Sequence, residues 1–117
     1  MRHLKKGKKF NRKKGERAVF LRNLSNNLIR RGKIETTETR AKAIRPTVEK
    51  LVTLAKKQNL ASRRLLFSRT RDRKISQKLF EEIAPRYIDR NGGYLKIIKS
   101  GKFRKRDGAQ VSIIEFV

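Results

Sequence analysis

The chain has 117 residues and a mass of 13.7 kDa, a length typical of one domain with a modest core. Its 34 lysines and arginines against 10 aspartates and glutamates give a formal charge of +24 at pH 7. Because self-repulsion of this size opposes compaction, the composition predicts a polyanionic partner, with nucleic acid ahead of an anionic membrane surface. The chain has no cysteine, which excludes disulfides, zinc-thiolate sites and a cysteine nucleophile. No apolar run fits a membrane span or a signal peptide, so we expect a cytoplasmic protein.

Residues 1–14 are a basic segment that contains eight lysines and arginines and no acidic residue. Leu4 and Phe10 are its only large apolar residues after the initiator methionine. Such a segment cannot bury enough apolar surface to offset the entropy of ordering. We therefore predict an extended N-terminal tail over 1–14, disordered when free and ordered against negative charge, followed by a single domain over 15–117.

Two helices joined by a short strand are predicted after the tail. Helical spacing of apolar residues begins near Glu16 and ends at Gly32, which follows two arginines and suits a left-handed helix terminus. Residues 33–37 favour a strand, and Thr36 or Thr37 can cap the second helix. The apolar stripe of that helix is Ala41, Ile44, Val48, Leu51 and Ala55. Pro46 lies within it and predicts a kink, with a helix break as the alternative.

Two shorter helices and two strands complete the pattern. The third helix opens at Asn59 or Leu60 and continues through Leu65, Leu66 and Phe67, which form its apolar side. Asp72 caps a fourth helix that Pro85 is expected to end. A turn at 91–93 precedes a strand over 94–99, residues 100–108 form a basic loop, and a last strand covers 110–117. The order of elements predicts an α+β domain in which about four helices pack on one face of a small mixed β-sheet.

The inventory of reactive side chains argues against an enzyme. His3 is the only histidine, so neither a zinc site nor a nucleophile and base pair can be assembled around it. The adjacent Glu81 and Glu82 point to different faces of a helix and are more typical of ion pairs than of magnesium ligands. We therefore expect no catalytic residues, no metal and no cofactor.

Basic side chains form the candidate binding site, because each can neutralise a phosphate. They fall into three clusters: the tail, a central cluster (Arg63, Arg64, Arg69 and Arg71) and a C-terminal cluster (Arg86, Arg90, Lys96, Lys99, Lys102 and residues 104–106). Three aromatic residues, Tyr87, Tyr94 and Phe103, lie among these charges and either stack on unpaired bases or lie in the core. The predicted RNA contacts from charge alone are Arg2, Lys5, Lys6, Lys8, Lys9, Arg12, Lys13, Lys14, Arg63, Arg64, Arg69, Arg71, Arg86, Arg90, Lys99, Lys102 and Arg104.

Several basic surfaces on one small domain favour folded structural RNA, which can surround it, over duplex DNA, which contacts one face. The sequence lacks both a basic helix-turn-helix and an aromatic pair of the RNP kind, so it supports neither sequence-specific DNA binding nor RRM-type recognition. Two alternatives stay open: a nucleoid-type DNA-architectural protein, and an RNA-processing enzyme that uses Glu82 or Asp89.

Motifs along the whole chain resemble the bacterial large-subunit ribosomal protein family L17. The opening motif is Met1-Arg2-His3, Gly7, Asn11-Arg12, Arg17 and Arg22-Asn23. The middle motif is Thr36-Thr37, Lys42-Ala43, Leu54-Ala55-Lys56 and Arg63-Arg64-Leu65. The most specific motif is Lys78-Leu79-Phe80, Glu82, Pro85-Arg86-Tyr87, Arg90 and Gly92-Gly93-Tyr94. Pro46 and the lysine-rich tail depart from the family pattern.

The resemblance implies a structural protein of the large ribosomal subunit, without enzymatic activity, that organises ribosomal RNA near the rim of the peptide exit tunnel. It also implies an α+β body with a tail threaded into RNA, a location in cytoplasmic ribosomes, and neighbours that include the L32 family protein. The RNA contacts that it adds to the charge-based set are His3, Asn11, Arg17, Arg22, Asn23 and Tyr94.

Overall fold

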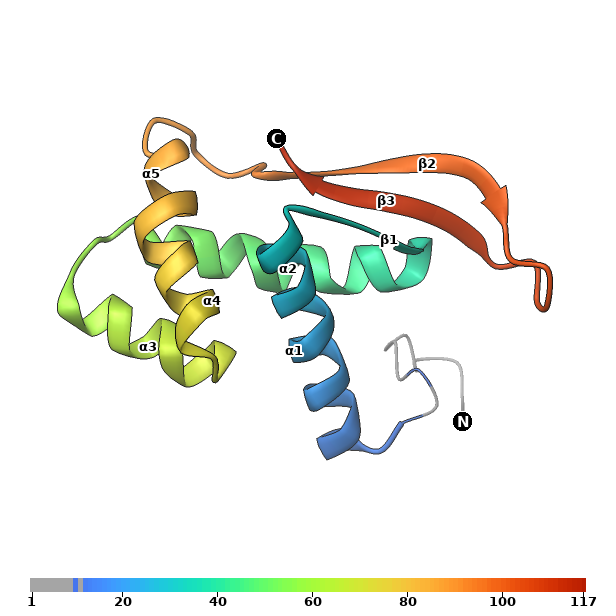
Figure 1. The fold of residues 1–117 in the computed structure, drawn as a ribbon, viewed down its shortest axis with the longest axis horizontal. Coiled ribbons are helices and arrows are strands. Elements are labelled where there is room, and N and C mark those ends of the chain that lie inside the picture. Colours follow the sequence, from blue (N-terminus) through green and yellow to red (C-terminus); the bar gives the residue numbers. More distant parts are fainter. Residues whose placement is uncertain (1–9, 11) are drawn as a thin grey trace, which may run out of the picture.

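The computed structural model describes residue 10 and residues 12–117, so the predicted contacts within 1–9 and at Asn11 lie outside the described residues. Helices and strands follow one another in a single body in which the hairpin of the last two strands extends beyond the helices (Figure 1). The elements in chain order are α1 (Lys14–Arg31), β1 (Lys33–Thr37), α2 (Glu38–Ala55), α3 (Leu60–Thr70), α4 (Arg73–Lys78), the π-helical turn η1 (Leu79–Ile83), α5 (Ala84–Arg86), β2 (Leu95–Phe103) and β3 (Gln110–Phe116).

The ends of the first two helices lie where local chemistry predicts them. Gly32 terminates α1 with a φ of 82°, a conformation that side chains with a Cβ disfavour, and its amide donates to the Leu28 carbonyl. The Thr37 hydroxyl oxygen accepts from the Arg40 amide and caps α2. Helix α2 then runs through Pro46, so the alternative of a helix break is wrong and the kink stays a prediction.

Helices α3 and α4 are capped by side chains and connected by two residues, Arg71 and Asp72. Asn59 and Ser62 form a reciprocal capping box at the start of α3. The Asp72 carboxylate accepts from the amides of Lys74 and Ile75 at 2.9 and 3.3 Å, as predicted for the fourth helix. Arg71 has a left-handed φ of 54°, and its amide donates to the Phe67 carbonyl. The connection therefore fixes α4 against α3.

The substitution Asp72→Ala tests this cap. Because both backbone amides lose their acceptor, we expect the free energy of unfolding to fall by about 1 kcal/mol. Urea denaturation followed by circular dichroism measures the change. Asp72→Asn keeps a capping oxygen and serves as the control, and an equal loss in both variants would show that the cap is not the cause.

The helix that begins at Arg73 continues past Pro85, which corrects the prediction that it ends there. In η1 the helix widens, and the Ala84 amide donates to the Leu79 carbonyl five residues earlier. Proline has no amide hydrogen, and the Gln58 side chain donates instead to the carbonyl of Phe80, at 2.9 Å. A donor from another segment thus satisfies the helix at this point, and three further residues, 84–86, stay helical.

The sheet is antiparallel throughout, in the order β1-β3-β2, so the predicted mixed sheet is wrong. Strand β3 lies in the centre, with Ile114 paired to Ile34 of β1 and to Ile97 of β2. Strand β2 is longer than predicted and reaches Phe103, which makes the expected 100–108 loop shorter. A register irregularity between Lys99 and Phe103 bends this extension.

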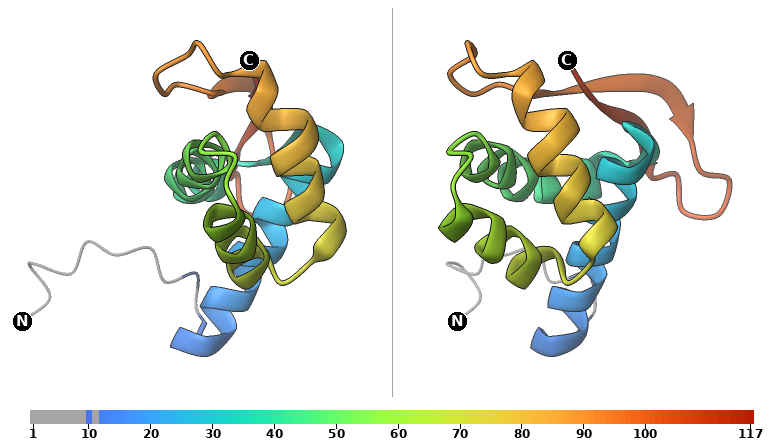
Figure 2. Two further views of the ribbon diagram at one scale, coloured as in Figure 1. Left: turned by 90° about the vertical axis from the view of Figure 1, so that its left-hand side faces the viewer. Right: turned by 60° about the vertical axis from the view of Figure 1, so that its left-hand side comes forward.

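The core lies between the sheet and the helices. Helix α2 contacts all three strands as well as α1, α3 and η1 (Figure 2). Its predicted apolar stripe is buried, and so are Leu28 of α1, Leu66 of α3 and Ile114 of β3. Helices packed on one small sheet confirm the predicted α+β class. They place the remaining faces of α1, α3 and α4 at the surface.

Candidate nucleic-acid interface

The described cations that we predicted as RNA contacts lie at the surface or are half-buried. Some basic residues are neutralised locally by carboxylates. These ion pairs are Arg30–Asp72, Lys42–Glu38, Arg45–Glu49, Lys96–Glu115, Lys99–Glu38 and Arg104–Asp107. Because only 10 acidic residues face 34 basic ones, most cations stay available for an external anion.

The segment before α1 packs its aromatic and basic side chains against the start of that helix. The Arg12 guanidinium lies 3.9 Å from the Phe20 ring centroid, and Arg40 of α2 lies 5.1 Å from it. The Phe10 ring is 5.6 Å from the same ring. Helix α1 begins at Lys14, so the described contacts of Phe10 and Arg12 lie directly before this helix.

Two neighbouring hollows run along the seam where α1 meets α3, and we call them together the arginine groove. The first has a volume of about 280 Å³, and its charged lining residues are Arg22, Lys50 and Arg69. The second, of about 420 Å³, is lined by Arg22 and Asn23 of α1 and by Arg71 after α3. The groove therefore joins the predicted contacts of the opening motif to two of the central arginines.

The walls of the arginine groove are fixed by polar contacts. Asn26 is 8% exposed and donates through its side-chain amide to the Thr70 carbonyl at 3.0 Å. Arg30 lies 3.9 Å from Asp72, the single carboxylate that lines the second hollow. The groove thus combines a buried hydrogen bond between α1 and α3 with an excess of positive charge, which suits a phosphate backbone.

A separate hollow of about 520 Å³ lies between the outer faces of α3 and α4, and we call it the Phe67 hollow. Its lining residues are Leu60, Arg63, Arg64, Phe67, Arg73, Ser76 and Gln77. It brings together the predicted Arg63 and Arg64. Sequence reasoning missed Phe67, which it assigned to the apolar side of the helix, and Arg73. The signal that was available is the spacing of 60, 63, 64 and 67, which places these residues on one face.

The C-terminal basic residues do not form one surface with the central ones. Lys99 of the hairpin contacts the Glu38 carboxylate, and Arg104 contacts that of Asp107. Lys102 is exposed near the hairpin tip, whereas Arg86 and Arg90 lie after η1 at the other end of the sheet. This cluster therefore presents cations in two places.

Tyr94 is a correction to the predicted contacts, because its side chain lies in the core and is 2% exposed. Burial raises the pKa of its phenol, but hydrogen bonds from Thr53 and Lys56 outweigh burial and lower that pKa below its ordinary value. Tyr87 is also buried, with its ring 5.3 Å from that of Tyr94. Of the three aromatic residues, Phe103 alone presents a free ring, at 64% exposed, so the other two are structural.

Glu38 illustrates how the ion pairs respond to pH. The hydrogen bond from Lys42, at 2.9 Å, lowers the pKa of this carboxyl below its ordinary value despite partial burial, and Lys99 lowers it further. A lowered pKa in the folded state means that the stabilisation is present above the unfolded pKa and is lost as the pH falls through the folded pKa.

We expect an NMR titration to give Glu38 a lower pKa than the same residue has in the Lys42→Gln variant, because that variant lacks the ammonium donor. An unchanged Glu38 pKa would show that Lys42 does not hold this carboxylate.

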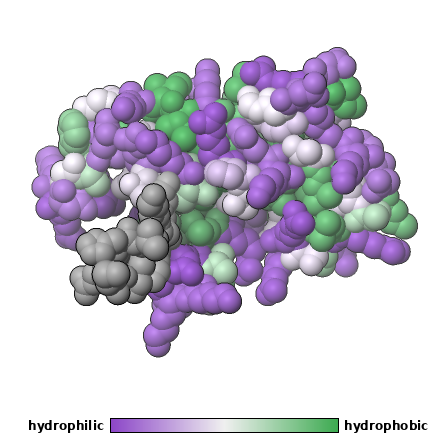
Figure 3. Space-filling model, turned by 180° about the vertical axis from the view of Figure 1, so that it is seen from behind, coloured by the Kyte–Doolittle hydropathy of each residue, from purple (hydrophilic) through white to green (hydrophobic). Residues whose placement is uncertain are grey.

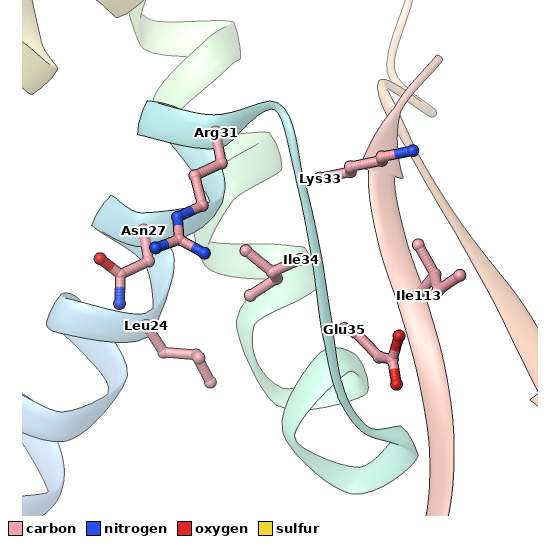
Figure 4. Close-up of a pocket in the computed structure, with 7 residues that line it drawn as sticks. All are labelled: Leu24, Asn27, Arg31, Lys33, Ile34, Glu35 and Ile113. Atoms are coloured by element: carbon pink, nitrogen blue, oxygen red, sulfur yellow. The ribbon is translucent and has the colours of Figure 1, made fainter. Parts of the chain in front are cut away.

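A further hollow, of about 500 Å³, opens between α1 and the sheet (Figure 4). Arg31 and Asn27 project from α1, while Lys33 and Glu35 belong to β1. A single carboxylate provides no acid and base pair. Among residues 10 and 12–117, no three histidine, cysteine or carboxylate side chains gather as metal ligands do. The structure therefore gives no support to the RNA-processing enzyme.

Hydrophilic side chains dominate the face seen in Figure 3, with apolar residues in separated patches. Over the described part of the chain, each helix is too short or too polar to span a bilayer. The predicted basic contacts lie on several elements: Arg22 and Arg69 in the arginine groove, Arg63 and Arg64 in the Phe67 hollow, and Lys102 on the hairpin. That arrangement fits a partner which surrounds the domain.

Comparison with known proteins shows to which family this chain belongs. The family described as Ribosomal protein L17 matches residues 20–117, which is most of the chain. The chain belongs to the ribosomal protein L17 family. Members of this family are structural components of the ribosome, so membership confirms a structural ribosomal protein of the large subunit and excludes the enzyme alternative.

Curated relatives extend the similarity to the whole chain. A protein of Persephonella marina named large ribosomal subunit protein bL17 is 56% identical over 118 residues, covering 100% of this chain and 95% of that protein. Proteins of the same name from Sulfurihydrogenibium sp. and Sphingopyxis alaskensis are 50% and 51% identical, each over 100% of this chain and over 97% and 84% of their own lengths. The matched region includes both the arginine groove and the Phe67 hollow.

Proposed function

We propose that this protein organises large-subunit ribosomal RNA near the rim of the peptide exit tunnel, by neutralising phosphates and by fitting the shape of folded RNA. The observation that carries the proposal is the arginine groove. There the fold gathers Arg22 of α1, Lys50 of α2 and Arg69 of α3 around a rigid seam. Three cations from three elements suit a backbone that crosses the seam, since their charge adds at one place.

Other cations face different directions, which supports binding to more than one RNA segment. The pair Arg63 and Arg64 lies on the outer face of α3, and Arg86 and Arg90 lie beyond η1. Lys99 and Lys102 of the hairpin form a third site. A protein with separate basic sites holds RNA segments at fixed distances from one another, and this is the role that we assign to it during and after subunit assembly.

The proposal includes the cations of residues 1–14, because a lysine-rich segment neutralises a phosphate backbone without needing a folded surface. It also includes the L32 family protein as a neighbour in the subunit, an expectation that rests on the L17 resemblance. Copurification of the two proteins from partly assembled subunits, after nuclease treatment, tests the second point.

Binding measured across a salt series tests the proposed function. The protein is titrated against large-subunit ribosomal RNA, a length-matched unrelated RNA and duplex DNA, between about 50 and 200 mM salt. Electrostatic binding weakens steeply over this range for all three, whereas shape-specific contacts persist. We expect the preference for ribosomal RNA to survive at high salt.

The same experiment separates the DNA-architectural alternative. If the affinities for all three nucleic acids show the same dependence on salt, charge alone explains binding. Shape recognition of ribosomal RNA is then refuted. If duplex DNA is the nucleic acid that keeps its affinity at high salt, the proposed preference for ribosomal RNA is refuted.

A further inference from the structure

The Phe67 hollow exposes apolar side chains that the core does not need. Phe67 is 45% exposed and Leu60 is 62% exposed, whereas Leu66 of the same helix is fully buried. Leu66 therefore attaches α3 to the core without help from Phe67. An exposed aromatic ring that contributes little to the core is available to a ligand.

Guanidinium groups surround the aromatic rings of this region. The Arg73 guanidinium lies 5.8 Å from the centroid of the Phe67 ring, and that of Arg63 lies 5.5 Å from the centroid of Phe80. Arg64 lines the same hollow from the middle of α3. Planar cations beside rings are the combination that holds a nucleobase by stacking and its phosphates by charge.

The charge of the hollow favours an anionic ligand. None of its lining residues is acidic. Of the carboxylates nearby along the chain, Asp72 caps α4, and Glu81 accepts a hydrogen bond at 3.2 Å from Gln77, which lines the hollow. Three arginines therefore line a hollow that also has two exposed apolar side chains, Leu60 and Phe67, and no acidic lining residue.

We propose that the Phe67 hollow binds an unpaired nucleotide of RNA, whose base stacks on the Phe67 ring and whose phosphates contact Arg63, Arg64 and Arg73. This inference rests on the proposed function and adds to it a defined site for single-stranded RNA. The arginine groove suits a phosphate backbone, whereas this hollow recognises a base that has left its helix. An acidic segment of another protein would also suit the positive charge of the hollow. It would not explain why the Phe67 ring is exposed beside the arginines.

The chain has no tryptophan, so the Phe67→Trp variant carries a single indole, which reports fluorescence from the hollow. Leu65→Trp is the matched control, because residue 65 lies on the same helix and is 40% exposed but does not line the hollow. The probes are a single-stranded RNA hexanucleotide of adenosine and uridine, a 12-base-pair RNA duplex and a polyglutamate peptide, each at about 150 mM salt. Fluorescence anisotropy of labelled RNA reports overall binding in parallel.

We expect the hexanucleotide to quench the indole of the Phe67→Trp variant strongly and saturably, and the duplex to quench it little. The indole of the Leu65→Trp variant should respond weakly to both. In the tryptophan-free chain, Phe67→Ala should weaken hexanucleotide binding by about fivefold or more. Phe67→Tyr should keep the binding of the unsubstituted chain, and Leu65→Ala should leave it unchanged. Circular dichroism confirms that each variant is folded.

Each other outcome overturns the inference in a recognisable way. RNA binding by anisotropy without preferential quenching in the Phe67→Trp variant refutes the nucleotide site and leaves the proposed function standing. A response of that variant to polyglutamate but not to the hexanucleotide replaces the nucleotide by an acidic peptide. No binding of large-subunit ribosomal RNA at all refutes both proposals.

Discussion

Replacing Ile44 by alanine is expected to lower the free energy of unfolding by about 2–5 kcal/mol. Ile44 is fully buried in the middle of α2, the helix that contacts all three strands and the helices around it. The substitution removes apolar burial and leaves a cavity that several elements border at once. Since small domains are stable by about 5–15 kcal/mol, this loss is a large fraction of the total.

Urea unfolding followed by far-UV circular dichroism, at one fixed salt concentration, measures the change. Val19→Ala is the control, because Val19 is 44% exposed on α1 and its truncation creates no cavity. We expect the control to change stability by less than about 0.5 kcal/mol. A loss below about 1 kcal/mol for Ile44→Ala would contradict the central position of α2 in the core.

Neutralising the arginine groove is expected to have the largest effect on RNA binding. In the triple variant, Arg22, Arg69 and Arg71 are changed to glutamine, which removes the cations on both sides of the seam. Each lost phosphate contact reduces the slope of log affinity against log salt by about one. We therefore expect the slope for large-subunit ribosomal RNA to fall by about two to three, and the affinity at about 0.15 M salt to fall by about tenfold or more.

The chain provides a control with the same change in net charge. Changing Lys42, Arg45 and Lys96 to glutamine also removes three positive charges, but each of these cations is already paired, with Glu38, Glu49 and Glu115. We expect the control to keep nearly the whole slope. If both triple variants lose equal affinity, total charge governs binding and the groove has no special role.

Local signals in the sequence predicted the elements well, because their causes are local. The positive φ of Gly32, the capping oxygens of Thr37 and Asp72 and the helical spacing of the α2 stripe each depend on a few neighbouring residues. The pairing direction of β1 has no such local cause, because it depends on how α2 and the later helices return the chain to the sheet. That is why the antiparallel order β1-β3-β2 was not predicted.

Long-range contacts also explain why the helix continues past Pro85. The rule that a proline ends a helix assumes that no other group replaces the lost amide donor. Here the Gln58 side chain, from the segment between α2 and α3, donates to the Phe80 carbonyl. Nothing near Pro85 in the sequence indicates this contact. The helix ends at Arg86, one residue past Pro85, and the hydroxyl of the following Tyr87 donates to the Val117 carbonyl at 2.7 Å.

The sequence predicted which residues belong to the candidate site, but not where they lie relative to one another in the fold. Charge counting identified Arg69 and Arg71, and the family resemblance added Arg22, but only the contact between Asn26 and Thr70 shows that α1 and α3 form one groove. Burial cannot be inferred from residue type for an aromatic side chain beside a charge. The exposed Phe67 was consequently assigned to the core, and the buried Tyr94 to the RNA contacts.

The position of β2 at the border of the sheet has a consequence for the free protein. Its outer backbone groups are unpaired by the sheet, and a long bare edge strand invites pairing with a second molecule and aggregation. Lys96, Lys99 and Lys102 line this strand, and the bend near Gly101, whose φ is 77°, interrupts its flatness. Lysines on an edge repel another strand that carries the same lysines. The lysines and the bend of this edge therefore disfavour strand pairing between two free molecules.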